Sequence, residues 1–465
     1  MGTLAAPPGG APAGVQVIHP ARRLRGQLDV PGDKSISHRA LMLALLASGE
    51  SRIHGAGDGA DVRSTAGIVR AFGASAERVD DDGRTVGYRV VSPGVDGIRE
   101  PSGVLDCGNS GTSLRLFAGI LAGLPMTAVL DGDASLRRRP VARIIEPLRA
   151  MGATLRALDG DTLPPVTVTG HDRLRPIDWT SPVPSAQVKS AILFAGLRAT
   201  GMTRVRESVA TRDHSERMLR ARGVSVRSLP DGEGGAVIEI EGGTTVQAME
   251  ERIPGDPSAA AFWLVAAAIH PDAELVIRNV GVNPTRRAVI DLLTRMGARI
   301  EERPAAGGAT GGADRGAPRG ADVGEPVADL IVRTSELGAI DVSPAEVAAA
   351  IDEIPILCLA ASQARGRSTI RGAGELRHKE SDRLTGIIAG LSALGAKLEV
   401  DGDDIVVHGP TPLLGAPADS LDDHRLAMTF AVAGLVASGR TTVGRPSSAA
   451  ISYPGFFTDL ERIRA

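Results

Sequence analysis

Six short loops place charged and polar side chains immediately before strongly apolar stretches of the chain. They read PGDKSISHR (31–39), DCGNSGTSLR (106–115), VPSAQVKS (183–190), IPGDPSA (253–259), IDEIP (351–355) and LDDHRLA (421–427). Ser, Asp, Asn and Pro are ordinary residues at a helix start, so helix capping would explain any single loop. The loops also carry side chains that risk desolvation beside apolar helices: Lys34, Arg39, Arg115, Gln187, Lys189, Asp352, Glu353, Asp423, His424 and Arg425. Together they indicate a functional site.

A second set of charged segments points to the kind of ligand. These segments are RRRPVAR (137–143), RDHSER (212–217), NPTRR (283–287) and RHKESDR (377–383). Exposed charge on a solvated helix is the alternative explanation. If the helices run parallel, however, their N-termini converge, and the free N–H groups and positive dipole ends favour anions. Arginine adds bidentate sites for phosphate or carboxylate. We therefore expect a substrate with two or more anionic groups.

Composition excludes several other classes of protein. A net charge of −3 argues against a nucleic-acid binder, and an aromatic content of 2% disfavours stacking platforms for bases. Two distant cysteines, Cys107 and Cys358, make no disulfide framework or Cys-rich zinc site, which suits a reducing cytoplasm. No apolar run reaches the ~18 residues of a membrane span. Residues 1–14 lack the features of a signal peptide, and we interpret them as a disordered tail.

Sequence motifs for other chemistries are missing as well. The chain contains no P-loop, no GxGxxG after a strand, no HExxH and no GxSxG elbow. The nine histidines are scattered and do not fall in metal-ligand spacing, so we expect no metal site.

The elements that must position the charged residues repeat along the chain. An apolar helix followed by a strand recurs six times at a period of about 73 residues. A second helix in the repeat ends at a glycine in five places: Gly73, Gly152, Gly223, Gly297 and Gly395. Each repeat is thus predicted as helix, strand, helix and further strands. The first helices, apolar all round, should be buried beneath outer sheets. One long repeat contains a Gly/Ala-rich tract, 303–327, predicted as a disordered insertion.

Seven segments in order resemble the EPSP synthase (3-phosphoshikimate 1-carboxyvinyltransferase) family over about residues 15–460. They are PGDKSISHRA (31–40), GNSGTSLRL (108–116), RRRPVARI (137–144), PSAQVKSAIL (184–193), TRDHSERML (211–219), HKESDRL (378–384) and DHRLAMTF (423–430). The resemblance implies an α/β fold: a two-domain inside-out α/β barrel of six βαβ-type repeats, three per domain, with buried parallel helices and outer sheets. It places 15–32 plus 254–465 in the first domain and 33–253 in the second, with the active site between them.

The resemblance also implies a reaction. Enolpyruvate would pass from phosphoenolpyruvate to the 5-hydroxyl of 3-phosphoshikimate, through a tetrahedral intermediate, with release of phosphate. The implied partners are these two small molecules, with no nucleic acid, membrane, metal or organic cofactor. The chain is expected to be a cytoplasmic monomer.

Residue roles carry over from the family motifs. The residues implied for 3-phosphoshikimate are Lys34, Ser35, Arg39, Ser185, Ala186, Gln187, Arg212, Asp352 and Lys379. Those implied for phosphoenolpyruvate are Lys34, Gly111, Arg139, Gln187, Arg383 and Arg425. The implied catalytic residues are Asp352, which would accept the 5-hydroxyl proton, Glu380 and Lys379 as candidates for protonating the methylene carbon, and Lys34 between the substrates.

The chain departs from the enterobacterial pattern of the family at two positions. Ile451 stands where that pattern has a lysine, and Glu375 stands where it has an asparagine.

Two alternative functions remain to be separated from this one. A UDP-N-acetylglucosamine enolpyruvyl transferase would have a Lys-Asn pair in its first motif, where this chain has Lys34-Ser35, and would carry a reactive cysteine in an Arg-rich loop. A non-catalytic anion-binding repeat protein is the other alternative. A phosphate-release assay with both substrates would separate these possibilities.

Overall fold

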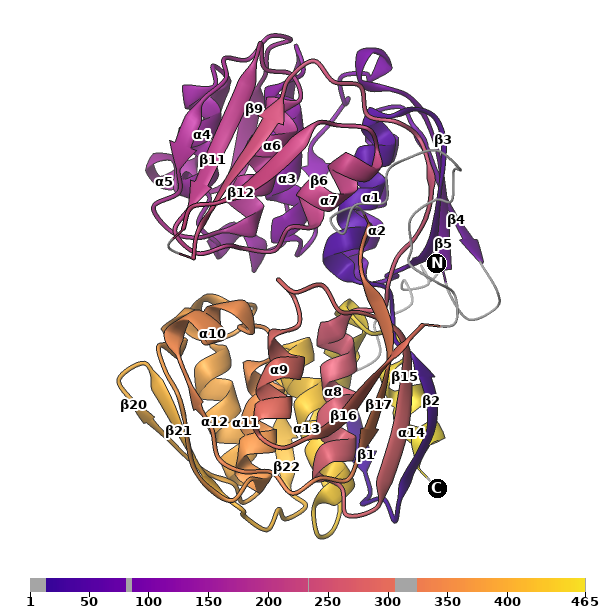
Figure 1. Cartoon of the computed structure of the whole chain (residues 1–465), viewed down its shortest axis with the longest axis vertical. Coiled ribbons are helices and arrows are strands. Elements are labelled where there is room, and N and C mark those ends of the chain that lie inside the picture. Colours follow the sequence, from indigo (N-terminus) through magenta and orange to yellow (C-terminus); the bar gives the residue numbers. More distant parts are fainter. Residues whose placement is uncertain (1–13, 81–85, 233, 306–323, 465) are drawn as a thin grey trace, which may run out of the picture.

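The structure is a computed structural model that describes residues 14–80, 86–232, 234–305 and 324–464. Apart from Gly14, the predicted disordered tail lies outside the described residues. Figure 1 shows two lobes stacked along the long axis of the molecule. Each lobe has its own cluster of buried apolar side chains, and the two clusters share no residue. We call the lobe that contains residues 15–29 and 456–463 the first lobe, and the other the second lobe.

The second lobe comprises one continuous stretch of chain. Its helices are α1 (Lys34–Leu46), α2 (Ala60–Ala71), α3 (Gly111–Ala122), α4 (Ala142–Ala150), α5 (Leu158–Asp161), α6 (Ala186–Gly196) and α7 (His214–Ala221), with the 3-10 turns η1 (Val95–Gly97) and η2 (Leu136–Arg138). Its strands are β3 (Ser48–Ala56), β4 (Ser75–Asp80), β5 (Val86–Pro93), β6 (Leu105–Asp106), β7 (Thr127–Asp131), β8 (Thr154–Ala157), β9 (Leu163–Thr169), β10 (Asp178–Thr180), β11 (Met202–Glu207), β12 (Val226–Pro230), β13 (Ala236–Glu241) and β14 (Glu250–Arg252).

The first lobe combines the start of the chain with its second half. Its helices are α8 (Pro257–Ile269), α9 (Ala288–Arg295), α10 (Pro344–Ala349), α11 (Ile354–Gln363), α12 (Arg383–Ala393), α13 (His424–Val436) and α14 (Phe456–Ile463), with the 3-10 turns η3 (Ala373–His378) and η4 (Pro446–Ile451). Its strands are β1 (Val15–Ile18), β2 (Leu24–Asp29), β15 (Ala273–Gly281), β16 (Arg299–Pro304), β17 (Val327–Arg333), β18 (Asp341–Val342), β19 (Gly366–Ile370), β20 (Lys397–Asp401), β21 (Asp404–Gly409), β22 (Pro417–Asp419) and β23 (Thr441–Gly444).

The predicted repeat is confirmed by the sheets. In the described part of the chain, five sheets have four strands in one common order, of which β6-β7-β9-β8 is an example. Strand β6 is parallel to β7, whereas β9 is antiparallel to both β7 and β8. The sixth sheet, β1-β23-β22, has three strands and takes one of them from the start of the chain. The chain is therefore built from six related α/β units.

The two helices of a repeat differ in burial, as their sequences predict. The first helix is enclosed on all sides: in α8 every residue from Pro257 to Ala268 is buried. The second helix buries one face, as α4 does with Ile144, Ile145 and Leu148. All five predicted terminal glycines have positive φ, from 82° at Gly223 to 110° at Gly152, which confirms the left-handed caps.

The lobes exchange strands at the point where the chain crosses between them. Strand β2 lies beside β15 in the first lobe, but the next element in sequence is α1 of the second lobe. Strand β14 lies beside β3 in the second lobe, but the chain then continues into α8 of the first. The crossing segments are bonded together: Asp33 N donates to Pro254 O (2.8 Å) and Asp256 N to Pro31 O (2.9 Å). Any movement between the lobes must bend this pair.

The predicted disordered insertion 303–327 is too wide. Arg303 and Pro304 belong to β16, and Val327 begins β17. Glu325 is 6% exposed and bonds to the second lobe. The Gly/Ala-rich composition that suggested disorder does not extend to these flanks, where the chain pairs and packs. The rest of the tract, 306–323, lies outside the described residues.

No helix within the described ranges is both long enough and apolar enough to cross a membrane.

Candidate active site

Helix capping accounts for many of the Asp and Ser residues in the charged loops. Side-chain oxygens accept bonds from the first-turn N–H groups of the helices that follow. The capping residues are Asp33 (α1), Ser110 (α3), Ser185 (α6), Asp256 (α8), Asp382 (α12) and Asp423 (α13). The cations and the carboxylates Asp352 and Glu380 are not explained in this way.

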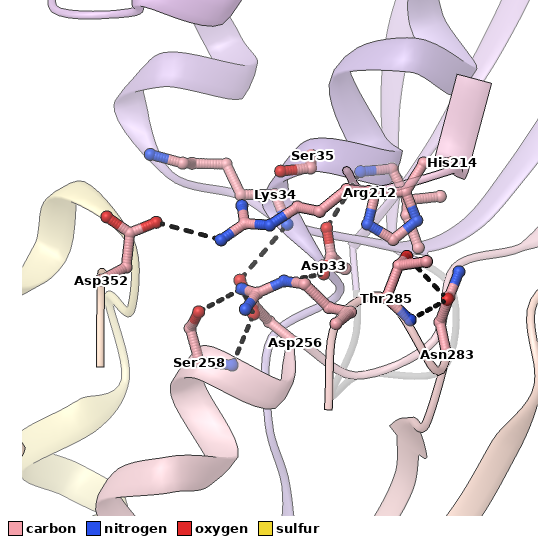
Figure 2. A network of polar contacts seen from close by, with 12 residues as sticks. Asp33, Lys34, Ser35, Arg212, His214, Asp256, Ser258, Asn283, Thr285 and Asp352 are labelled. Atoms are coloured by element: carbon pink, nitrogen blue, oxygen red, sulfur yellow. Dashed lines mark hydrogen bonds and ion pairs between the residues drawn. The ribbon is translucent and has the colours of Figure 1, made fainter. Parts of the chain in front are cut away.

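Asp352 lies where the two lobes meet. Its Oδ2 is 3.5 Å from the NH2 group of Arg212 in the second lobe, and its Oδ1 is 3.6 Å from the NH1 group of Arg383 in the first. Figure 2 shows Arg212 extending toward Asp352 across the interface. Burial raises the pKa of Asp352, but Lys379, Arg212 and further arginines outweigh burial and hold that pKa well below its usual range. Asp352 is thus a carboxylate that can accept a proton.

Glu380 is also ionised in this structure. It accepts a hydrogen bond from the NH2 group of Arg383. Burial raises its pKa, but Arg383, His424, Arg139 and Lys34 together outweigh burial and lower that pKa below its usual range. As it stands, Glu380 cannot donate a proton at neutral pH, so a role as an acid requires the surrounding positive charge to be neutralised first.

Arg383 connects the two carboxylates and is completely buried. Its Nε donates to Asp423 Oδ2 (2.9 Å), whereas its NH1 group has no hydrogen-bond partner among the described residues. Arg425 is 6% exposed; its guanidinium acts on the charge of Asp352, but no hydrogen bond or close ion pair of this group is found in the described part of the chain. Because buried cations need partners, both groups are suited to holding an anion.

Lys34 has a partner that the sequence analysis missed. Its Nζ donates to Asp61 Oδ2 (3.0 Å). Burial lowers the pKa of Lys34, but Asp61 and Glu380 outweigh burial and raise it, so Lys34 is a stable ammonium. Asp61 lies at the start of α2, the position at which other repeats carry charge, and that regularity could have identified it.

Arg39 is held more firmly than a freely available ligand-binding arginine. It is 3% exposed and donates to Ser35 O (2.9 Å), Ser190 Oγ (2.8 Å) and Ser215 Oγ (2.7 Å). Burial lowers its pKa to about 10. Arg39 therefore fixes Ser35 and contributes positive charge from beneath the surface.

Arg115 is one of the charged loop residues to which the family resemblance assigned no role. Its NH1 group donates to Gln187 Oε1 (2.6 Å), and Gln187 Nε2 donates to Thr112 Oγ1 (3.0 Å). A Cβ at Gly111 would lie 2.6 Å from Arg115 NH1 and 3.8 Å from Arg139 NH1. Gly111 thus leaves space beside two cations.

Lys379, from the charged segment 377–383, and Lys189, from the loop 183–190, have different surroundings. Lys379 Nζ is 3.6 Å from Glu375 Oε1 at the edge of the site. Lys189 is buried between Glu207 (2.9 Å) and Glu216 (2.8 Å), so its role is structural. Within the described residues, no group of three or more His, Cys, Asp or Glu could hold a metal ion.

Comparisons with known proteins agree with one another. The family profile of EPSP synthase (3-phosphoshikimate 1-carboxyvinyltransferase) matches residues 18–460. The 3-phosphoshikimate 1-carboxyvinyltransferase of Gloeobacter violaceus is 49% identical over 96% of this chain and 98% of its own length. The 3-phosphoshikimate 1-carboxyvinyltransferase of Bacillus cereus is 42% identical over 95% of this chain and 97% of its own length.

Solved structures show the same relationship. EPSP synthase from Acinetobacter baumannii aligns with a TM-score of 0.82 at 38% identity, covering 97% of this chain and 98% of that chain. The enolpyruvyl transferase NikO from Streptomyces tendae aligns with a TM-score of 0.71 at 21% identity, over the same shares of the two chains, and indicates a common fold.

Proposed function

The chain belongs to the EPSP synthase family, and from this premise we propose how its residues carry out the family's reaction. The enzyme transfers the enolpyruvyl group of phosphoenolpyruvate to the 5-hydroxyl of 3-phosphoshikimate and releases phosphate. This reaction belongs to the shikimate pathway of aromatic amino-acid biosynthesis. The single observation that supports the proposed site best is Asp352, held between Arg212 and Arg383 where the lobes meet.

The two lobes act as two domains in this proposal. The first would comprise 15–32 plus 254–465 and the second 33–253. The separate apolar cores and the bonded crossing segments support these boundaries. Substrates would bind between the domains, beside the contact of Arg212 with Asp352.

Phosphoenolpyruvate would be held by cations from both domains. Its anionic groups would complete the hydrogen bonding of Arg383 and Arg425, with Arg139 opposite them. Lys34 and Gln187 would complete the site beside Gly111. Because the side chain of Ile451 has no donor, these arginines would also bind the phosphate in place of a lysine at that position.

The second substrate would lie against the second domain. The residues proposed for 3-phosphoshikimate are Lys34, Ser35, Arg39, Ser185, Ala186, Gln187 and Arg212, with Asp352 and Lys379 approaching from the first domain. Arg39 would act through the Ser35 carbonyl and its positive field, because its donors are already used.

Asp352 and Glu380 would carry the two proton transfers. Asp352 would take the 5-hydroxyl proton as the oxygen attacks C2 of phosphoenolpyruvate, while C3 gains a proton, giving a tetrahedral intermediate. Glu380 or Lys379 would supply the C3 proton. Bound anions would neutralise Arg383, Arg139 and Lys34, and this raises the pKa of Glu380 toward that of a useful acid. Loss of a methyl proton and of phosphate would then give the product.

This mechanism needs no metal or organic cofactor, because proton transfer and charge stabilisation both come from side chains. We propose that the enzyme works as a monomer in the cytoplasm, for which the two reduced, buried cysteines are suited.

A phosphate-release assay tests the function. We expect turnover with phosphoenolpyruvate and 3-phosphoshikimate, and none when UDP-N-acetylglucosamine replaces the shikimate. Turnover of phosphoenolpyruvate only when UDP-N-acetylglucosamine is the acceptor would support the alternative transferase. No turnover with either acceptor would support an anion-binding protein without catalysis.

A further inference from the structure

Five polar residues join the lobes immediately beside Arg212. Asp213 and His214 begin α7 in the second lobe, Asn283 and Thr285 lie between β15 and α9 in the first, and Glu325 lies two residues before β17. We call this group the interlobe latch. Figure 2 shows His214, Asn283 and Thr285 close together, on the side of Arg212 away from Asp352.

Hydrogen bonds connect all five residues of the latch in one network. The two oxygens of Glu325 accept from His214 Nδ1 and from Asn283 Nδ2, each at 2.8 Å. Asn283 Nδ2 also donates to Asp213 Oδ1 (2.7 Å), and so does Thr285 Oγ1 (3.1 Å). Both partners of Glu325 are donors here, because an ionised carboxylate only accepts. An amide at this position would keep both bonds only if His214 changed tautomer and accepted at Nδ1, which would leave its buried Nε2–H without a partner among the described residues.

Three of the five latch residues are buried, whereas Asp213 and Thr285 are partly exposed. His214 and Asn283 are each 1% exposed, and Glu325 is 6% exposed. Arg217 reinforces the contact by donating to Asp213 Oδ2 (2.8 Å) and to Gly324 O (3.2 Å). Buried networks of this kind specify one arrangement when complete and are costly when one partner is missing.

Arg212 depends on this arrangement. The one side-chain contact found for it among the described residues is with Asp352, 3.5 Å away. No second hydrogen bond from the described ranges fixes its guanidinium, so its position follows from the backbone at residues 212–213. The latch holds that backbone against the lobe that carries Asp352.

We propose that the interlobe latch positions Arg212 for 3-phosphoshikimate, which makes Glu325 and Asn283 positioning residues for substrate binding. The proposal rests on the proposed placement of Arg212 at that substrate. It assigns a role to Glu325, which neither the motifs nor the family resemblance identified. The latch closes only when the lobes are together, so it couples substrate binding in one lobe to the catalytic carboxylate of the other.

The test compares Glu325→Gln with Glu301→Gln, which removes a charge from an exposed ion pair of the same lobe. The dissociation constant of 3-phosphoshikimate is measured by calorimetry, and kcat by phosphate release at saturating substrate. We expect Glu325→Gln to raise that constant about tenfold, the effect of one lost bond to a charged group, and to change kcat much less. We expect Glu301→Gln to change neither. An unchanged constant in Glu325→Gln would overturn the proposal.

A double-mutant cycle separates positioning from a general structural role. In an Arg212→Gln background, Glu325→Gln should cause no further loss of affinity, whereas an equal loss in both backgrounds would overturn the proposal. Asn283→Asp, which places a third carboxylate in the latch, should repeat the result if Glu325→Gln folds poorly. Failure of the proposed function would show differently, as wild-type enzyme that does not turn over.

Discussion

The burial of His38 predicts that the second lobe loses stability in mild acid. His38 lies on α1 with a fully buried side chain, and its Nδ1 is 2.6 Å from Thr65 Oγ1. Its Nε2 has no partner among the described residues. Burial lowers the pKa of His38 from 6.5 to about 3; Asp61 opposes this shift, and Lys34 and Arg39 add to it. The folded enzyme therefore keeps this imidazole neutral.

The sign and size of the effect follow from that shift. Below pH 6.5 the unfolded chain binds a proton at this residue and the folded chain does not, so the free energy of unfolding falls as the pH falls. The loss approaches about 1.4 kcal/mol per pH unit well below pH 6.5 and amounts to about 2 kcal/mol between pH 6.5 and 4.5. Carboxylates with lowered pKa begin to lose their contribution near pH 5, where the unfolded chain starts to protonate them, and this loss is the same in wild type and in His38→Asn.

Urea unfolding at pH 6.5, 5.5 and 4.5 measures this slope. Fluorescence follows both lobes, because Trp179 lies in the second and Trp263 in the first. We expect His38→Asn to reduce the pH dependence of the second-lobe transition by about 1.4 kcal/mol per unit. His408→Asn, at a histidine whose side chain is 46% exposed, is the control and should leave the slope unchanged. Parallel slopes for wild type and His38→Asn would refute the reasoning.

Three further predictions concern backbone space and lobe movement. Gly32 lies in the crossing segment, and Gly32→Ala would place a Cβ 1.9 Å from Gly55 O, so we expect a lower Tm and a reduced kcat. Gly103→Ala, where no atom lies within 4 Å of the added Cβ, is the control and should change neither; equal Tm values for the two variants would contradict this. Gly111→Ala narrows the space beside Arg115. Glyphosate competes with phosphoenolpyruvate in the EPSP synthase family, so we expect its inhibition constant to rise more than the KM of phosphoenolpyruvate, and equal shifts would refute the steric explanation. The cations facing each other repel without bound anions, so 3-phosphoshikimate should decrease the radius of gyration in small-angle scattering by bending 31–34 and 253–256; an unchanged radius would count against closure.

Local features of this fold could be predicted from sequence because they depend on nearby residues. Apolar helices and glycine caps are set by side-chain pattern and by the left-handed conformation that Gly152 or Gly223 adopts. The strand exchange could not be predicted in this way. Pairing of β14 with β3 joins residues about 200 positions apart in sequence, and no local pattern specifies it.

In the candidate site, too, the sequence motifs predicted some residues, while others depend on contacts between distant parts of the chain. The motifs identified the charged residues that meet between the lobes, such as Arg212 and Asp352. They did not identify Asp61 or Glu325, because a single carboxylate has no sequence signature until its cationic or donor partner is located in space. The protonation state of Glu380 was likewise beyond sequence, since it depends on how many cations surround it.

The most direct test of the proposed mechanism is kcat after Asp352→Asn and Glu380→Gln, with the dissociation constant of 3-phosphoshikimate measured alongside. Each change removes the proton function and keeps the shape. We predict that each lowers kcat by roughly 10²–10⁴, the usual contribution of a general acid or base, with much smaller changes in the dissociation constant. Glu399→Gln, at a residue whose side chain is 64% exposed, serves as the control and should keep wild-type kcat. Near-wild-type kcat in either variant, or complete loss of 3-phosphoshikimate binding, would contradict the role assigned to that carboxylate.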